Sequence, residues 1–290
     1  MNVAIKSYKN AILVTLGLLA SNAIIAQPKA ALNVVYEFTY VRDLENRADP
    51  YRENTILTLA DGQSRFCSER LYNENSPQER EVQQQAAMDP KGPVIVVVGR
   101  PMLRVGKYGS IVLEEIHKDI TNDKLTTVGI FGFQTYYMDG AMPDIAWEMG
   151  SERKQIGAYE CRKATGAYAG RNYTVWFAPD LPFSDGPWKL GGLPGLILEA
   201  HDDKNEVAFV VKEISKNTDA RRTVMSFLRD ENSIETNPRA YRRARMAFEQ
   251  DPETVAAAQR PNSTLVISNV DDPEDNTVKK IKKYNPMELD

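Results

Sequence analysis

Residues 186–199 have the sequence GPWKLGGLPGLILE, and this stretch decides how the centre of the chain folds. It places four glycines and two prolines directly before an apolar run that begins at Leu196. Proline cannot donate a hydrogen bond to a sheet, and glycine adopts backbone angles that other residues avoid. The stretch therefore predicts a stiff crossing that ends one pair of strands and starts the next, with Gly195 easing the entry into the new strand.

Strands are expected on both sides of this crossing. Residues 154–163 and 171–177 form the first pair, and residues 196–200 and 206–214 form the second. The short connections within the pairs leave no room for the long crossover that parallel strands need. The centre of the chain therefore predicts an antiparallel sheet.

The N-terminal half shows a similar pattern. Residues 34–40 alternate between apolar and more polar side chains, which is typical of a strand with one buried face. Asp61 and Gly62 separate two further strand patterns and predict a hairpin, because both turn positions need a positive φ. Further strands are expected at residues 94–98, 111–116, 126–137, 145–149 and 265–268.

Helices are expected in two places. Residues 76–88 begin with a serine, a proline and a glutamate at the spacing of a capping box. Residues 219–260 show helical periodicity after Asn237 and Asp251, which are typical capping residues. Together these patterns predict a mainly β protein of the α+β type, with a curved antiparallel sheet or open half-barrel and a few helices packed at one side.

The N-terminus has the three parts of a secretory signal peptide. Lys6 and Lys9 precede an apolar run at residues 11–20, and small residues lead to a cleavage site near Ala26. An uncleaved anchor is the alternative. No later segment approaches the ~20 apolar residues of a membrane-spanning helix. We expect residues 1–26 to be removed and residues 27–290 to form a single exported domain.

The charge of the chain argues against one class of partner. Removal of the leader takes away two lysines and no acids, so the formal charge changes from −4 to −6 (−4 minus 2). An acidic chain lacks the basic field that holds nucleic acid. We therefore expect no nucleic-acid partner.

Two cysteines, Cys67 and Cys161, lie in predicted strands. In an oxidising compartment they could form a disulfide, which would stabilise the fold by about 4 kcal/mol because it closes a long loop. The alternative is two separate buried thiols that pack as small apolar residues. The sequence does not decide between them, because a disulfide depends on geometry.

Several segments resemble one family of proteins. GGLPGLILE at residues 191–199 follows PDLPFSDGPW at residues 179–188, and the tail contains YNPMEL. IGAYECRKATG at residues 156–166 and GRNYTVWFAPDLP at residues 170–182 are similar to the same family. The chain thus resembles the GLPGLI family of exported proteins of Gram-negative bacteria. The motif consists of Gly191, Gly192, Leu193, Pro194, Gly195, Leu196 and Ile197.

This resemblance implies a mainly β fold and a place in the periplasm or at the outer membrane. It supplies no catalytic residue, because members of the family are mostly uncharacterised. Residues 76–88 and 219–260 depart from what the resemblance implies, and either segment could carry a function special to this protein.

Two histidines, His117 and His201, are available for catalysis or metal binding. His201 stands beside Asp202 and Asp203 at the mouth of a predicted hairpin, and such a cluster could hold a metal or orient an imidazole. A solvated turn explains the same residues and is favoured, because the spacing offers no further ligand. We expect no cofactor, and a hydrolase or metal-dependent enzyme is the alternative function.

The tryptophans give the candidate binding site. Trp176 ends a strand, and Trp188 lies in the proline-rich loop with Leu193 and Pro194. Stiff loops that display aromatic residues hold ligands at a small entropic cost, although each tryptophan could equally fill the core. We expect a non-enzymatic binding or accessory protein that holds a peptide-like or apolar ligand, or that docks on an outer-membrane assembly.

Overall fold

The computed structural model describes residues 32–60, 62–74, 104–105, 113–132, 134–216, 233–259, 268–269 and 281–289. The expected signal peptide at residues 1–26, the expected helix at residues 76–88 and the expected strand at residues 94–98 lie outside the described residues. None of the helices within these described ranges is long and apolar enough to cross a membrane.

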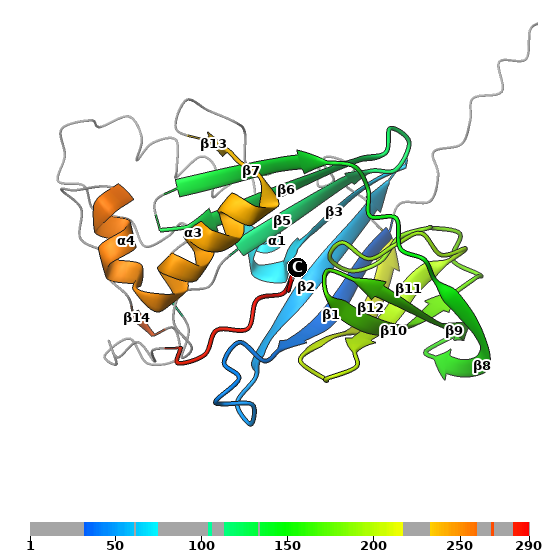
Figure 1. Cartoon of the computed structure of the whole chain (residues 1–290). Helices are drawn as coiled ribbons and strands as arrows, with labels where there is room; N and C mark the ends of the chain where they lie inside the picture. Colours follow the sequence, from blue (N-terminus) through cyan, green and yellow to red (C-terminus); the bar gives the residue numbers. More distant parts are fainter. Residues whose placement is uncertain are drawn as a thin grey trace, which may run out of the picture.

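Twelve strands form one mixed sheet that curves without closing (Figure 1). The mainly β fold and the curved open sheet predicted from the sequence are therefore confirmed. The strands are β1 (Leu32–Tyr40), β2 (Tyr51–Ala60), β3 (Gln63–Ser68), β5 (Leu113–Asp119), β6 (Lys124–Phe131), β7 (Gln134–Gly140), β8 (Glu148–Ile156), β9 (Tyr159–Tyr168), β10 (Arg171–Ala178), β11 (Leu196–Asp202), β12 (Val207–Lys216) and β13 (Ile234–Glu235).

The sheet consists of two antiparallel meanders joined side by side. Its strand order is β13-β7-β6-β5-β3-β2-β1-β12-β11-β10-β9-β8. The first strand, β1, pairs with β2 on one side and with β12 on the other, and both pairings are antiparallel. The one parallel pairing described in this sheet lies at its edge, where β13 pairs with β7. A separate parallel pair is formed by β4 (Arg104–Val105) and β14 (Ser268–Asn269).

Two predicted strands are in fact hairpins. Residues 126–137 form β6 and β7 around Gly132, whose φ is +59°. Residues 154–163 span the turn between β8 and β9, where Gly157 has a φ of +56°. In both places apolar residues continue past the turn, so the sequence pattern hid the reversal. The hairpin predicted at Gly62 is present, and this residue has a φ of +75°.

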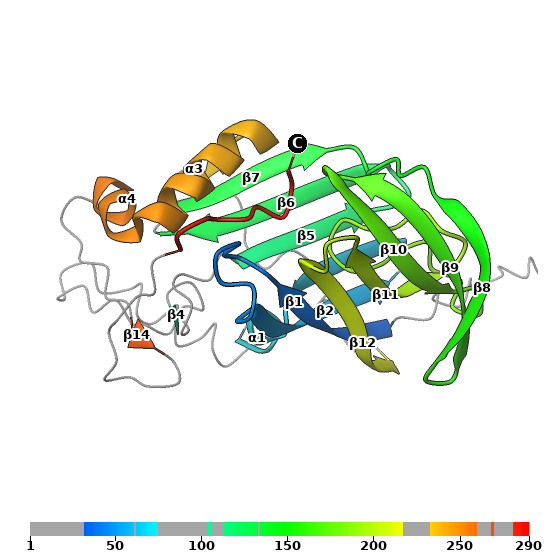
Figure 2. The same cartoon turned by 60° about the horizontal axis from the view of Figure 1, so that its bottom comes forward.

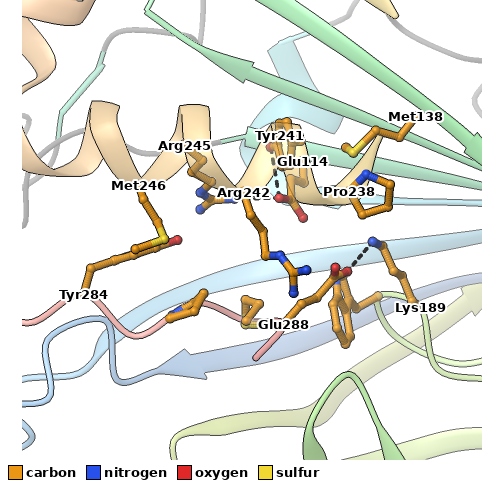
Figure 3. A pocket seen from close by; sticks show the side chains of 13 residues that line it. Glu114, Met138, Lys189, Pro238, Tyr241, Arg242, Arg245, Met246, Tyr284 and Glu288 are labelled. Carbon is orange, nitrogen blue, oxygen red and sulfur yellow. Dashed lines mark hydrogen bonds and ion pairs between the residues drawn. The ribbon is translucent and has the colours of Figure 1, made fainter. Parts of the chain in front are cut away.

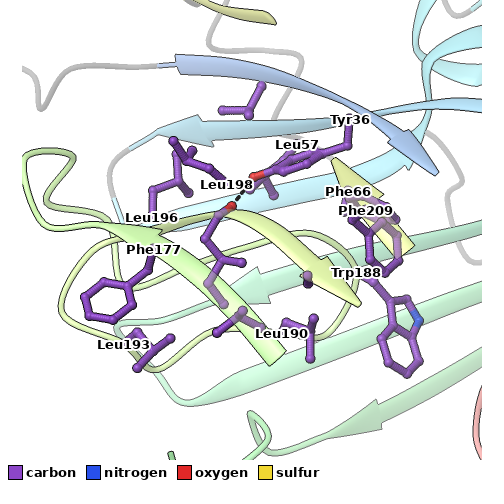
Figure 4. Packing of buried hydrophobic residues seen from close by; sticks show 14 of the residues in the cluster. Tyr36, Leu57, Phe66, Phe177, Trp188, Leu190, Leu193, Leu196, Leu198 and Phe209 are labelled. Carbon is purple, nitrogen blue, oxygen red and sulfur yellow. Dashed lines mark hydrogen bonds between the residues drawn. The ribbon is translucent and has the colours of Figure 1, made fainter. Parts of the chain in front are cut away.

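The proline-rich loop, residues 179–195, packs against the concave face of the sheet and is called the motif loop below (Figure 4). Its Leu190 and Leu193 are buried in the main core cluster, together with Leu57 of β2. The hydroxyl of Tyr36 on β1 donates a hydrogen bond to the carbonyl of Ile197 at 2.7 Å. The motif loop therefore fills part of the concave side of the sheet.

Lys118 of β5 fixes the motif loop to the other half of the sheet. Its ammonium group is fully buried and donates to the Oδ1 atom of Asp185 at 2.6 Å. It also donates to the carbonyls of Gly186 at 2.8 Å and Leu190 at 3.0 Å. All three ammonium hydrogens are thereby used, which is how a buried charge is accommodated.

Within the described residues, three helices accompany the sheet: α1 (Glu69–Glu74), α3 (Pro238–Gln250) and α4 (Pro252–Gln259). The latter two lie within residues 219–260, where the sequence predicts helix. Helix α3 begins after Asn237, whose side chain accepts a hydrogen bond from the backbone N–H of Ala240 at 3.0 Å. Tyr241 and Phe248 of α3 pack on Phe131 of β6, so the helix covers this part of the concave face.

Both cysteines are free and buried in the structure. Cys67 packs with Ile56 and Leu71 in a small cluster, whereas Cys161 belongs to the main core. The disulfide considered from the sequence is therefore not formed here. Burial raises the pKa of Cys67 to about 12, which keeps this thiol protonated and unreactive.

Candidate binding site

The last described residues, 281–289, cross the concave side beside α3, and they are called the C-terminal strap below (Figures 1 and 2). At one end, the carboxylate of Asp43 accepts hydrogen bonds from the backbone N–H groups of Lys282 at 3.0 Å and Lys283 at 3.1 Å. At the other end, the N–H of Leu289 donates to the carbonyl of Ala169 at 2.9 Å. The strap is therefore held at both ends.

Arg171, the first residue of β10, holds the middle of the strap. Its buried guanidinium donates to the side-chain oxygen of Asn285 at 2.9 Å and to the carbonyl of Met287 at 3.0 Å. The same group forms ion pairs with Asp202 at 2.6 Å and Glu206 at 2.9 Å. Because the N–H groups of this guanidinium all have acceptors, its side chain is held rigidly. The strap is therefore an ordered part of the fold.

Two adjoining cavities lie between the concave face, α3 and the strap. The aromatic cavity has a volume of about 70 Å³, and the polar cavity has a volume of about 30 Å³ (Figure 3). Both are partly open. Four residues line both cavities, and these are Glu114, Trp188, Arg245 and Met287. The two cavities therefore share a wall, and together they form the candidate site.

Aromatic rings form the apolar wall of the aromatic cavity. Phe38 stacks on Phe209 with ring centroids 4.8 Å apart, and on Tyr40 at 5.8 Å. Phe66 meets Phe209 edge to face at 6.0 Å. Figure 4 shows Trp188 beside Phe66 and Phe209. Rings packed against one another in this way give a rigid apolar surface.

Two buried polar groups on this wall lack a hydrogen-bond partner among the described residues. They are the indole N–H of Trp188 and the hydroxyl of Thr55, and both residues are 3% exposed. A buried polar group without a partner costs about 1–3 kcal/mol. Because Trp188 lines both cavities, its indole N–H is the candidate donor for a ligand there.

The charged wall between the cavities is internally paired. Arg245 of α3 forms an ion pair with Glu114 of β5 at 2.6 Å, and Arg42 pairs with Glu249. The hydroxyl of Tyr241 donates to Glu114 at 3.0 Å. Burial and the charge of Glu114 raise the pKa of Tyr241 well above its usual value, so this phenol remains a neutral donor.

Residues 169–199 match a family whose description is "Protein of unknown function (Porph_ging)". The matched segment contains Arg171, which holds the strap, and Asp185 and Trp188 of the motif loop. A search of the curated proteins found no match. Crystal structures of PNGF-II in space groups P21 and C2 resemble the chain with TM-scores of 0.47 and 0.48 and identities of 14% and 13%. Each covers 74% of this chain and 32% of PNGF-II, so the chain spans about a third of that protein.

Only one of the four binding residues suggested by the sequence lines the candidate site. Trp188 lies in both cavity walls, whereas Leu193 is buried in the core and Pro194 is exposed. Trp176 is partly exposed and lies under the ammonium group of Lys154, 5.5 Å from its ring centre. The sequence missed Phe38, Phe66, Phe209 and Met287, and only the alternation of the strands marked the first three.

The structure does not bring the proposed metal or catalytic cluster together. Asp202 is buried and pairs with Arg171, while the carboxylate of exposed Asp203 accepts a hydrogen bond from Asn172 at 3.1 Å. His201 contacts only the backbone carbonyl of Asp202, at 3.4 Å, among the interactions described. Within the described ranges, no group of three or more His, Cys, Asp or Glu side chains could hold a metal ion.

The other histidine, His117 on β5, belongs to a buried charged cluster. Its Nε2 atom contacts the carboxylate of Glu115, which also accepts a hydrogen bond from Arg65 at 2.9 Å. Burial alone would raise the pKa of Glu115, but the hydrogen bond from His117 and the charge of Arg65 lower it to about 2. Glu115 is thus a carboxylate that the fold stabilises in its charged form.

This cluster predicts a loss of stability in acid. The pKa of Glu115 in the folded protein, about 2, lies below its ordinary value of 4.5. Its contribution is therefore complete above pH 4.5 and is lost as the pH falls toward 2, by about 3 kcal/mol in total. Urea unfolding at a series of pH values should show this loss in the wild type and a flatter profile in Glu115→Gln. The exposed Glu160→Gln is the control, and equal profiles for both variants would contradict the prediction.

Proposed function

We propose that this chain is an exported binding protein of the GLPGLI family, which holds a peptide-like or apolar ligand between the concave face and the C-terminal strap. The observation that carries the proposal is the indole N–H of Trp188, buried without a partner in the wall of a partly open cavity. Apolar walls with a few convergent polar groups are typical of ligand sites. The expected signal peptide supports a place in the periplasm or at the outer membrane.

The rigidity of the site supports binding rather than catalysis. Its aromatic wall is packed within the core, and its arginines and glutamates are largely paired with one another. A preformed cavity of this kind loses little entropy when a ligand enters. The volume of about 70 Å³ admits only part of a ligand, whose remainder would extend toward the polar cavity.

Native mass spectrometry of the protein purified from its own cells tests this proposal. We expect a mass above that of the chain, with the excess lost on denaturation. Trp188→Phe keeps a ring but removes the N–H, so its bound fraction should fall several-fold. Trp176→Phe, which changes a tryptophan outside both cavities, should retain the ligand. A chain mass without excess under both native and denaturing conditions would refute the proposal.

A further inference from the structure

The polar cavity carries one more positive than negative side chain. Its charged lining residues are Lys189, Arg242, Arg245, Glu114 and Glu288. Lys189 of the motif loop pairs with Glu288 of the strap, and Arg245 pairs with Glu114 at 2.6 Å. The positive charge that is left belongs to Arg242.

The guanidinium of Arg242 makes no hydrogen bond or ion pair with another residue that the structure describes, although this residue is only partly exposed. Figure 3 shows its guanidinium extending from α3 toward the strap, near Glu288 and Lys189. Guanidinium groups bind carboxylates through two parallel hydrogen bonds, and this pairing is stronger where water is partly excluded. The cavity therefore contains a guanidinium that could bind the carboxylate of a ligand.

The neighbouring aromatic cavity indicates a second chemical group that the ligand should carry. It shares Trp188 and Met287 with the polar cavity, and its wall is formed by the rings of Phe38, Phe66 and Phe209. With a volume of about 70 Å³, it has room for a small apolar group such as the end of a leucine side chain. A ligand that fills both cavities therefore carries an acidic group close to an apolar one.

We infer that the ligand is a carboxylate that bears a small branched apolar group, and that Arg242 binds the carboxylate while the apolar group enters the aromatic cavity. This inference rests on the proposed function and names the class of ligand for the same site. The C-terminal residue of a peptide and a free branched carboxylic acid share this chemistry.

Isothermal titration calorimetry of the mature full-length chain tests the inference with a matched pair of probes. N-acetyl-L-leucine carries the carboxylate, and N-acetyl-L-leucinamide has nearly the same shape without the charge. We expect the wild type to bind the acid at least about tenfold more tightly than the amide. Arg242→Gln should reduce this preference to about twofold or less and leave binding of the amide unchanged.

Arg243→Gln is the matched control. It removes the same charge from the neighbouring residue of α3, whose side chain is exposed and does not line either cavity. It should keep the preference of the wild type for the acid. A third probe, 4-methylpentanoate, separates the two sources of the carboxylate. If 4-methylpentanoate binds as tightly as N-acetyl-L-leucine, the ligand is a free acid. If it binds about tenfold more weakly, the ligand is the C-terminus of a peptide.

The outcomes separate this inference from the proposed function. Equal affinity of the wild type for acid and amide, or an unchanged preference in Arg242→Gln, would overturn the inference. The proposed function as a binding protein would still hold. Failure to bind either probe, in a protein whose native mass shows a bound ligand, would also overturn the inference alone. Failure to bind either probe together with a native mass free of ligand would overturn both.

Discussion

Gly195→Val is expected to lower the free energy of unfolding by roughly 3–5 kcal/mol, because the motif loop leaves no space for a side chain there. A Cβ atom at this position would lie 2.4 Å from the carbonyl oxygen of Ala178, 2.7 Å from its carbonyl carbon and 2.9 Å from the Cα atom of Pro179. All three are backbone atoms, so the clash cannot be relieved by rotating a side chain. Valine would also have to adopt the φ of Gly195, +154°, which L-residues rarely adopt, and this adds to the cost of the clash.

Gly192→Val in the same motif is the matched control. Gly192 is exposed, and the nearest atom to an added Cβ is the indole nitrogen of Trp147 at 3.9 Å. Its φ of +86° should cost only about 1–2 kcal/mol. Thermal and urea unfolding of both variants would measure the difference. A Gly195→Val protein with wild-type stability that has lost only its ligand would instead make the motif part of the binding site.

The contrast between these glycines shows what local sequence could predict. Prolines and glycines before an apolar run predict a crossing between strands, because their backbone restrictions act within a few residues. The hairpin at Gly62 was predictable for the same reason. The sequence could not separate Gly192 from Gly195, because the clash at Gly195 comes from Ala178 at the end of β10 and from Pro179 directly after it.

The candidate site depends on contacts between distant segments, which explains why most of it was missed. Arg171 and Asn285 are 114 positions apart, and Arg245 and Glu114 are 131 positions apart. Neither pair has a spacing that marks it in the sequence. Trp188 was singled out because an aromatic residue in a stiff loop is conspicuous, whereas Phe38 and Phe209 resemble any other buried strand residue. This wall of the cavity forms only when β1 pairs with β12, because that pairing places the two rings face to face.

The same dependence on distant contacts makes Lys118 the second position where a large effect is expected. Lys118 and Asp185 are 67 positions apart and both are fully buried. The Oδ2 atom of Asp185 has no hydrogen-bond partner among the described residues, so the lysine is the main compensation for this buried charge. Burial lowers the pKa of Lys118, and the charge of Asp185 opposes that change. The pair is therefore coupled, and removing one partner exposes the full cost of burying the other.

Lys118→Met, which keeps most of the length of the side chain and removes its charge, should destabilise the protein by about 3–5 kcal/mol in urea unfolding at pH 7. The double variant Lys118→Met/Asp185→Asn should recover part of this loss, because the uncompensated carboxylate is gone while the carbonyls of Gly186 and Leu190 still lack their donor. Lys154→Met breaks a partly exposed pair with Glu199 and should change stability by about 1 kcal/mol or less. If Lys118→Met lowered the free energy of unfolding by no more than Lys154→Met does, the motif loop would be held by its apolar contacts alone. A recovery in the double variant would instead show that the buried charge pair anchors the loop, and with it Trp188 in the wall of the candidate site.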